Sequence, residues 1–231
     1  MPAHTSIAES AWQTILQPYY QEFGIDSTTI PASAGRRPFD DAMVDVLEEF
    51  APTVVSFHFG LPRQELLARV KSRGAFVLSC ATTLNEARWL VANGADGVIA
   101  QGLEAGGHRG HFLDRDVTYQ AYTLDLLKQL APHIHVPIVA AGGIADAQGV
   151  QAAIAAGASA VQVGTAFLLC NEAKTSALHR ARLSDVHAPT TLTNLFTGGL
   201  REVCSTASCT NSARTTQQHL LSRWLHKASH C

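Results

Sequence analysis

Short apolar runs recur along the middle of the chain, each followed by a polar or glycine-rich turn and then by apolar residues at helical spacing. The runs begin at Thr53, Ala75, Asp96, Val136 and Ser159, so the intervals between them are 22, 21, 40 and 23 residues. A strand of about five residues, a helix of about ten and two short turns fill a period near 22. Continuous rather than alternating apolar runs are typical of parallel strands that are buried on both faces. The pattern therefore predicts β/α units around a parallel sheet.

Helix start and stop signals fill the intervals between these runs. Thr83 or Asn85 is suited to begin one helix and Gly94 to end it, while Asp146 and Gly157 bracket another. Short polar side chains cap helix N-termini, and glycine accepts the left-handed backbone that ends many helices. Ahead of the repeat, two further helices are predicted, over residues 6–24 and 39–50.

Two architectures use such units, the closed (β/α)8 barrel and the open doubly wound sheet. Polar residues or glycines stand at the end of every predicted strand, which favours the barrel, although five units are visible rather than eight. We therefore predict an α/β fold of the (β/α)8 TIM-barrel type, incomplete, with about five of its eight strands. The expected divisions are residues 1–52 as N-terminal helices and loop, 53–170 as barrel core with an insertion at 109–135, and 171–231 as C-terminal helices and divergent tail.

Composition narrows the class of protein. The chain is 46% hydrophobic and 16% charged with a net charge of −2, which argues against disorder and against nucleic-acid or anionic-membrane partners. The five cysteines show no paired spacing, so neither a disulfide framework nor a metal site is expected. No signal-peptide pattern and no stretch of about 18 apolar residues is visible, and a cytoplasmic location is expected.

Glycines at two successive strand ends suggest a binding site for an anion. Gly142 and Gly143 follow one predicted strand, and Gly164 and Thr165 end the next. Glycine lets a ligand approach the backbone, and the loops after the last two strands of a β/α barrel commonly bind phosphate. The alternative is that these glycines only make tight turns.

The stretch "DGVIAQGLEAGGHRGHF" places an amide, two glycines and an imidazole after a buried strand. Gln101 could offer a donor and an acceptor to the edge of a ring, and Gly106 and Gly107 leave room for it. A neutral imidazole at His108 is suited to act as a base towards a carbon acid. The alternative is that His108, one of eleven histidines, is simply solvated.

Three segments, "VVSFHFGLP", "IAQGLEAGGHRG" and "VPIVAAGGIADAQGVQAAIAAGASAVQVGTAF", resemble the nitronate monooxygenase family over about residues 11–197. The resemblance implies a TIM barrel that uses FMN and O₂ to oxidise alkyl nitronates or nitroalkanes to a carbonyl compound and nitrite. It implies that His108 is the catalytic base. It also implies that the flavin is contacted by Gln101, Gly106, Gly143, Gln162, Val163, Gly164 and Thr165, with Gly143, Gly164 and Thr165 at its phosphate.

The chain also departs from this family. The first three barrel strands, with their Ala-Pro-Met and Gly-Gly-Leu-Gly segments, have no counterpart here, so the chain is expected to be N-terminally truncated relative to the family and to bind FMN poorly by itself. The alternatives are a flavin-dependent enoyl-acyl-carrier-protein reductase that uses NAD(P)H, and a non-catalytic truncated member. The expected partners are an alkyl nitronate and O₂, without nucleic acid or membrane, and the oligomeric state stays open.

Overall fold

The computed structural model describes residues 14, 16–22, 24–26, 38–114, 116–185, 187–193 and 201–204. It divides the chain into two compact units, Met1–Pro38 and Phe39–Cys231. In the first unit residues 16–22 are helical, within the helix predicted over 6–24. The division falls at residue 38 rather than after residue 52, because helix α2 (Asp41–Phe50) packs against the elements that follow it. The second unit contains the predicted β/α repeat.

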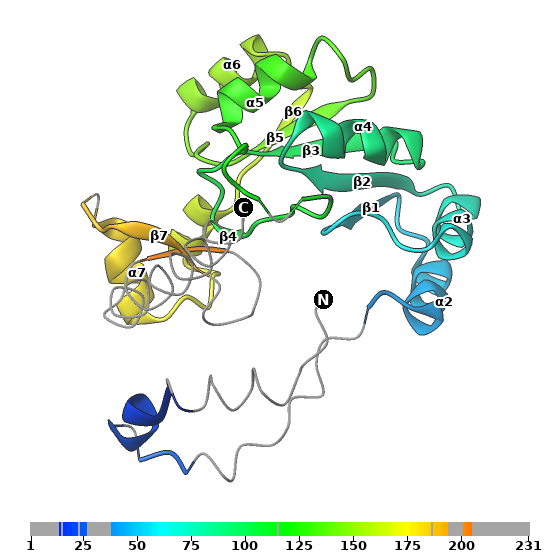
Figure 1. Ribbon diagram of the computed structural model, residues 1–231. Coiled ribbons are helices and arrows are strands. Elements are labelled where there is room, and N and C mark those ends of the chain that lie inside the picture. Colours follow the sequence, from blue (N-terminus) through cyan, green and yellow to red (C-terminus); the bar gives the residue numbers. More distant parts are fainter. Residues whose placement is uncertain are drawn as a thin grey trace, which may run out of the picture. The chain divides into compact units, whose positions relative to one another are not determined.

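A parallel sheet of five strands forms the centre of this unit (Figure 1). Its strand order is β1-β2-β3-β5-β6, so each strand pairs with its neighbour in the β/α repeat. The strands are β1 (Val54–Phe57), β2 (Phe76–Ala81), β3 (Gly97–Gln101), β5 (Ile138–Ala141) and β6 (Ala160–Gln162). Each apolar run contains one of them, so the predicted repeat is confirmed. The described strands form a half-barrel, as expected for an incomplete TIM barrel.

Four helices connect these strands, namely α3 (Gln64–Ser72), α4 (Leu84–Ala92), α5 (Thr123–Leu130) and α6 (Ala147–Ala155). The predicted capping is confirmed: Asp146 accepts a hydrogen bond from the Gly149 amide at 2.8 Å, and Thr83 caps α4. Residues 109–135, expected as an insertion, include α5, which crosses back over the sheet as the other helices do. Among the described helices, none combines the length and the apolar character that crossing a membrane requires.

The two faces of the sheet bury different side chains. Helices α4, α5 and α6 cover one face (Figure 1) and enclose the main core, in which Val98, Leu126 and Ala140 are fully buried. Alternate residues point to the other face, where Cys80 and Ile99 belong to a smaller cluster. In a barrel this second face is the interior. The carboxyl ends of β3 and β5 lead from it into the loops that hold the predicted site residues.

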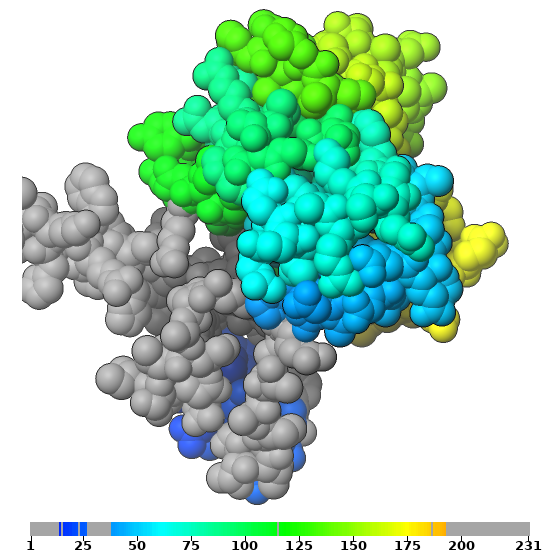
Figure 2. Space-filling view, turned by 90° about the vertical axis from the view of Figure 1, so that its right-hand side faces the viewer, coloured from blue at the N-terminus to red at the C-terminus, as the bar shows by residue number. Residues whose placement is uncertain are grey.

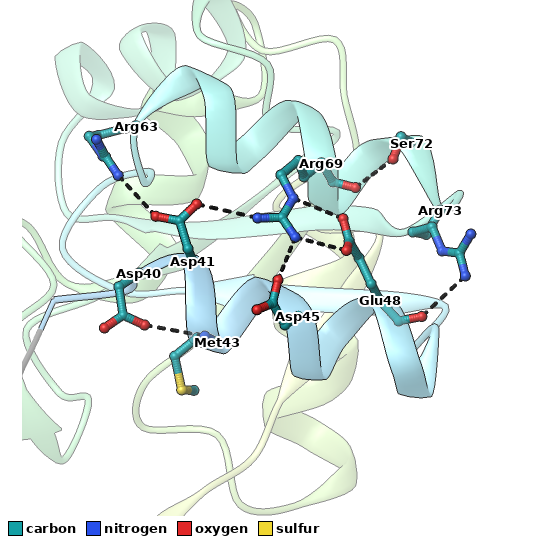
Figure 3. A network of polar contacts seen from close by, with 9 residues as sticks. All are labelled: Asp40, Asp41, Met43, Asp45, Glu48, Arg63, Arg69, Ser72 and Arg73. Atoms are coloured by element: carbon teal, nitrogen blue, oxygen red, sulfur yellow. Dashed lines mark hydrogen bonds and ion pairs between the residues drawn. The ribbon is translucent and has the colours of Figure 1, made fainter.

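Helix α2 is held against α3 by an ion-pair network centred on Arg69 (Figure 3). Its guanidinium contacts Asp41 at 3.3 Å, Asp45 at 2.6 Å and Glu48 at 2.8 Å. The hydrogen bond from Arg69 lowers the pKa of the Glu48 carboxyl. The space-filling view shows residues of α2 and α3 joined in one continuous surface, blue beside cyan (Figure 2). Because these groups lie at the surface, the network should weaken as salt is added.

A second, antiparallel sheet was not expected from the sequence. It consists of β4 (Gly107–His108), β8 (Arg201–Cys204) and β7 (Thr190–Thr193), in that order. Between β6 and β7 lie the 3-10 helix η2 (Thr165–Leu169) and helix α7 (Ala177–Ser184). Residues 171–231 were expected to form helices and a divergent tail, but β7 and β8 form strands because they pair with each other and β8 also pairs with β4. The helix predicted near the C-terminus lies outside the described residues.

Candidate active site

The glycines predicted to bind phosphate lie at one edge of the parallel sheet. Ala141 pairs with Gln162, so Gly143 and Gly164 each follow their strand by two residues at its carboxyl end. Gly143 has φ +67°, a conformation that favours glycine, and a side chain at Gly164 would meet nothing within 4 Å. Both residues are exposed, and neither backbone amide donates to an acceptor within the part of the chain that the structure describes. This edge can therefore present amides to an anion.

The loop after β3 touches the loop after β6 at Gly106 and Thr165. A Cβ atom on Gly106 would lie 2.7 Å from the Thr165 hydroxyl oxygen, closer than real contacts allow. Two predicted cofactor residues from distant parts of the sequence therefore meet. Two further predicted cofactor residues, Gln162 and Val163, lie at the end of β6, where Gln162 is exposed and Val163 is packed against the main core.

Gln101, at the end of β3, is bonded to the histidine loop. Its side-chain nitrogen donates to the backbone oxygen of His108 at 2.9 Å, and its side-chain oxygen accepts from the Gly110 amide at 2.7 Å. The residue is 6% exposed. Its amide thus holds both sides of Arg109 in place, a function that the sequence did not suggest. Contact between Gln101 and a flavin stays a prediction.

Arg109 is fully buried and folds the same loop back onto β3. Its guanidinium donates to the backbone oxygens of Gly102 and Gln101, the latter at 3.0 Å, and to the side-chain oxygen of Gln120 at 2.9 Å. Together with Gln101, these bonds cross-link the strand end to the loop. A buried charge costs free energy unless hydrogen bonds satisfy it, so Arg109 requires this loop geometry.

Two carboxylates that sequence reasoning missed anchor the loop further along. Glu86 is 2% exposed and accepts hydrogen bonds from the Phe112 amide at 2.7 Å and from both the amide and hydroxyl of Thr82 at 2.7 Å. The sequence did contain a signal for a role of Glu86 at the start of α4, since Thr83 and Glu86 have capping-box spacing. The Glu86 side chain, however, reaches the amide of the preceding Thr82 and then the distant loop.

Glu104 is the second of these carboxylates, and it belongs to the Glu-Ala-Gly-Gly-His stretch itself. It accepts hydrogen bonds from the Thr123 amide at 2.8 Å and the Thr123 hydroxyl at 2.9 Å. The first residue of α5 is thereby joined to the glycine loop. A carboxylate at this position also suits the helix dipole.

His108 lies half-buried in β4, where its backbone pairs with Arg201 of β8. His58, from the end of β1, places its Nε2 atom 3.2 Å from the His108 carbonyl oxygen, a contact that requires the proton on Nε2. Partial burial lowers the pKa of His58, and the charges of His108 and Arg109 lower it further, against the raising effect of that hydrogen bond. The sequence assigned no catalytic role to His58, and the structure places it beside the predicted base.

Neither Ser79 nor Cys80 of β2 is arranged as a nucleophile. The Ser79 hydroxyl donates to the Gly60 carbonyl at 2.9 Å and is fully buried. Burial raises the pKa of the Cys80 thiol to about 12, against a smaller lowering effect of Arg109. A protonated, buried thiol is unreactive. Among the described residues, no group of three metal-ligating side chains comes together.

Comparison with known proteins decides the family. A family model described as nitronate monooxygenase matches residues 6–216. The chain belongs to the nitronate monooxygenase family. It is 41% identical over 192 residues to a nitronate monooxygenase of Pseudomonas aeruginosa, and 40% identical over 205 residues to one of Paraburkholderia phytofirmans. These alignments cover 83% and 86% of this chain but 55% of either relative, so the chain spans about half the length of the curated relatives it matches.

Solved structures agree with the family assignment. This member of the nitronate monooxygenase family is similar to a nitroalkane oxidase from Streptomyces ansochromogenes, with a TM-score of 0.80 and 38% identity over 90% of this chain and 60% of that one. It is also similar to FabK from Thermotoga maritima, with a TM-score of 0.63 and 31% identity over 74% of this chain and 52% of that one. The resemblance inferred from the sequence motifs is thus confirmed.

Proposed function

We propose that this chain carries the catalytic base and much of the cofactor site of an FMN-dependent nitronate monooxygenase. Such an enzyme oxidises alkyl nitronates with O₂ to a carbonyl compound and nitrite. The main support is the gathering of Gly106, Gly143, Gly164 and Thr165 at one sheet edge, next to the loop of His108. Family membership supports the same activity, since nitronate monooxygenases are flavin-dependent in general.

The residues at this edge fit a phosphorylated cofactor. The exposed amides of Gly143 and Gly164 and the Thr165 hydroxyl would hold the phosphate, because amide and hydroxyl donors at strand ends bind anions. Gly106 and Gln101 would lie towards the isoalloxazine, and Gln162 and Val163 would complete the contacts. When bound, FMN supplies the electron-transfer chemistry that couples oxidation of the substrate to reduction of O₂.

His108 would remove a proton from the carbon that bears the nitro group. This step builds negative charge on the nitro oxygens, which nearby backbone amides can stabilise. A preformed nitronate has already lost that proton. Turnover of neutral nitroalkanes should therefore depend on His108 much more than turnover of nitronates does.

The test uses the full chain, supplied with FMN, and measures nitrite release from nitroethane and from ethyl nitronate. We expect His108→Asn to lower nitroethane turnover by at least about a hundredfold and to affect the nitronate far less. Equal loss on both substrates would contradict the role of His108 as base. If wild-type protein releases no nitrite from either, the non-catalytic alternative holds.

Cofactor binding is tested separately by titration of FMN. Thr165→Ala should weaken FMN affinity by about tenfold through loss of one hydrogen bond to a charged group. Thr53→Ala, at an exposed position just before β1 and therefore at the amino end of the sheet, is the matched control and should leave affinity unchanged. Equal affinities for both variants would argue against a phosphate at Thr165.

The similarity to FabK supports a second candidate, a flavin-dependent enoyl-acyl-carrier-protein reductase. NADH-dependent reduction of a crotonyl thioester, measured on the same preparation, separates the two activities. We also propose a cytoplasmic location, for which the free thiols of Cys80 and Cys170 are the supporting observation.

A further inference from the structure

The backbone of Phe59 adopts an unfavourable conformation. Its φ is +66°, in the left-handed region that L-residues with large side chains rarely occupy. Among the described residues other than glycine, only Ala51, with φ +41°, shares a positive φ. Ala51 ends a helix, where this conformation is common. Phe59 has no such local reason, and glycine would fit its backbone better.

The neighbours of Phe59 hold this turn in place. The register of β1 and β2 pairs Phe57 with Ser79, whose hydroxyl bonds the Gly60 carbonyl at 2.9 Å. Gly60 in turn faces the ring of Phe112, since a Cβ there would lie 3.2 Å from it. Contacts of the neighbouring residues therefore fix the conformation of this turn. The positive φ that they impose on Phe59 is unfavourable for a residue that has a side chain.

Burial does not explain the phenylalanine either. The residue is 48% exposed, so its ring contributes little to the core. Its ring contacts are two imidazoles, His58 with a centroid distance of 4.4 Å and His108 with one of 6.2 Å, both edge-on. Residues held in strained conformations cluster at functional sites, where the placement of the side chain is required for binding or catalysis.

We propose that the Phe59 ring is an apolar wall beside His108 that contacts the alkyl chain of the substrate and thereby favours longer chains. This inference rests on the proposed function. A base that removes the proton next to a nitro group must approach the carbon that also carries the alkyl substituent. An apolar surface adjoining the imidazole therefore faces that substituent, and each methylene group that it covers strengthens binding.

The first experiment measures dissociation constants of 1-nitroalkanes from nitroethane to nitrohexane with the FMN-supplemented full chain, by calorimetry or NMR titration. For wild-type protein we expect affinity to increase about two- to fourfold per added methylene. Phe59→Ala should remove most of this increase, and Phe59→Leu should keep part of it. A chain-length dependence that is absent in wild-type protein, or unchanged in Phe59→Ala, would overturn the proposal.

A second measurement separates the strain from the ring. Phe59→Gly and Phe59→Ala both lack the ring, but only glycine relieves the backbone, so Phe59→Gly should melt about 2–4 °C higher than Phe59→Ala. Ala51→Gly is the matched control, which should relieve strain while keeping the wild-type dependence on chain length. If Phe59→Gly melts no higher than Phe59→Ala, the argument from strain is wrong.

The outcome for Phe59 is distinguishable from that for the activity. Binding constants are obtained whether or not nitrite is released. A retained chain-length dependence without nitrite would contradict the proposed function and support the apolar wall, whereas nitrite release without chain-length dependence would do the reverse.

Discussion

The side-chain amide of Gln101 donates a hydrogen bond of 2.9 Å to the backbone carbonyl of His108. The same side chain accepts from the Gly110 amide at 2.7 Å, so one residue at a strand end determines the path of the loop that carries the predicted base. His58 approaches the same carbonyl from another strand. The position of His108 is thus set by two strands and not by its own loop alone.

Gln101→Glu should destabilise the protein. Glutamate can still accept from Gly110, but its second oxygen would face the His108 carbonyl without a proton between them, in a site that is 6% exposed. Loss of a buried hydrogen bond in this way should lower the free energy of unfolding by about 1–3 kcal/mol, measured by urea denaturation. The control is Gln129→Glu on the exposed side of α5, and equal stability of the two variants would contradict the assigned contact.

Glu86→Gln should loosen the far end of the same loop. A glutamine has one acceptor oxygen, so it cannot serve both Thr82 and Phe112 as the carboxylate does. We expect hydrogen exchange of the Phe112 amide to become at least about tenfold faster, measured by NMR or mass spectrometry. Glu65→Gln removes the same charge from the exposed first turn of α3 and should leave exchange of the Phe112 amide unchanged. Unchanged exchange at Phe112 in Glu86→Gln would contradict the proposed anchoring of the loop by Glu86.

The pH dependence of stability should include a contribution from His58. Because its folded-state pKa is lowered below the usual 6.5, the unfolded chain takes up the proton first as the pH falls. Stability is therefore complete above pH 6.5 and declines below it. His58→Gln, which keeps a donor for the His108 carbonyl, should lose less stability than wild-type protein between pH 7 and pH 5. His133→Gln, at an exposed position, is the comparison and should follow the wild-type curve.

Cys80 should resist thiol reagents in the native protein. Burial raises its pKa from 9.0 to about 12, so at pH 8 its thiolate fraction is about a thousandfold below that of an ordinary thiol. Peptide mapping after alkylation should find the exposed Cys170 labelled and Cys80 unlabelled until urea is added. The stabilising effect of the protonated thiol is complete below pH 9.0 and is lost as the pH rises through about 12. Labelling of Cys80 at the rate of Cys170 would contradict this burial.

Much of the half-barrel follows from local patterns. Strands β2, β3 and β5 are largely buried, which suits a nearly continuous run of apolar residues. Strands β1 and β6, at the edges of the described sheet, are exposed or half-buried. Asp146 caps α6 because its side chain reaches an amide three residues away. Gly94 and Gly157 end their helices with φ of +100° and +104°, which other residues adopt only with strain. These are short-range requirements, and short-range sequence is enough to state them.

The assignment of partners to polar groups does not follow from such patterns. Glu86 has the spacing of a capping box, yet one of its oxygens serves the Phe112 amide 26 residues later. The small sheet joins His108 to Arg201, and neither two-residue β4 nor the threonine-rich β7 has a strand pattern strong enough to indicate the pairing. The sequence offers several possible acceptors for each hydrogen-bond donor. Which of them a donor reaches depends on how the folded chain packs.

By itself, the sequence determined the β/α repeat, the helix ends, the glycine-lined edge and the family, because each depends on residues close together in the chain or on a motif. Only the tertiary structure decided that the Gln101 amide holds the His108 loop, that Phe59 stands strained against that histidine and that Gly106 meets Thr165. Hydrogen bonds and close contacts act over a few ångströms in space, whereas Gly106 and Thr165, for example, lie 59 residues apart in sequence.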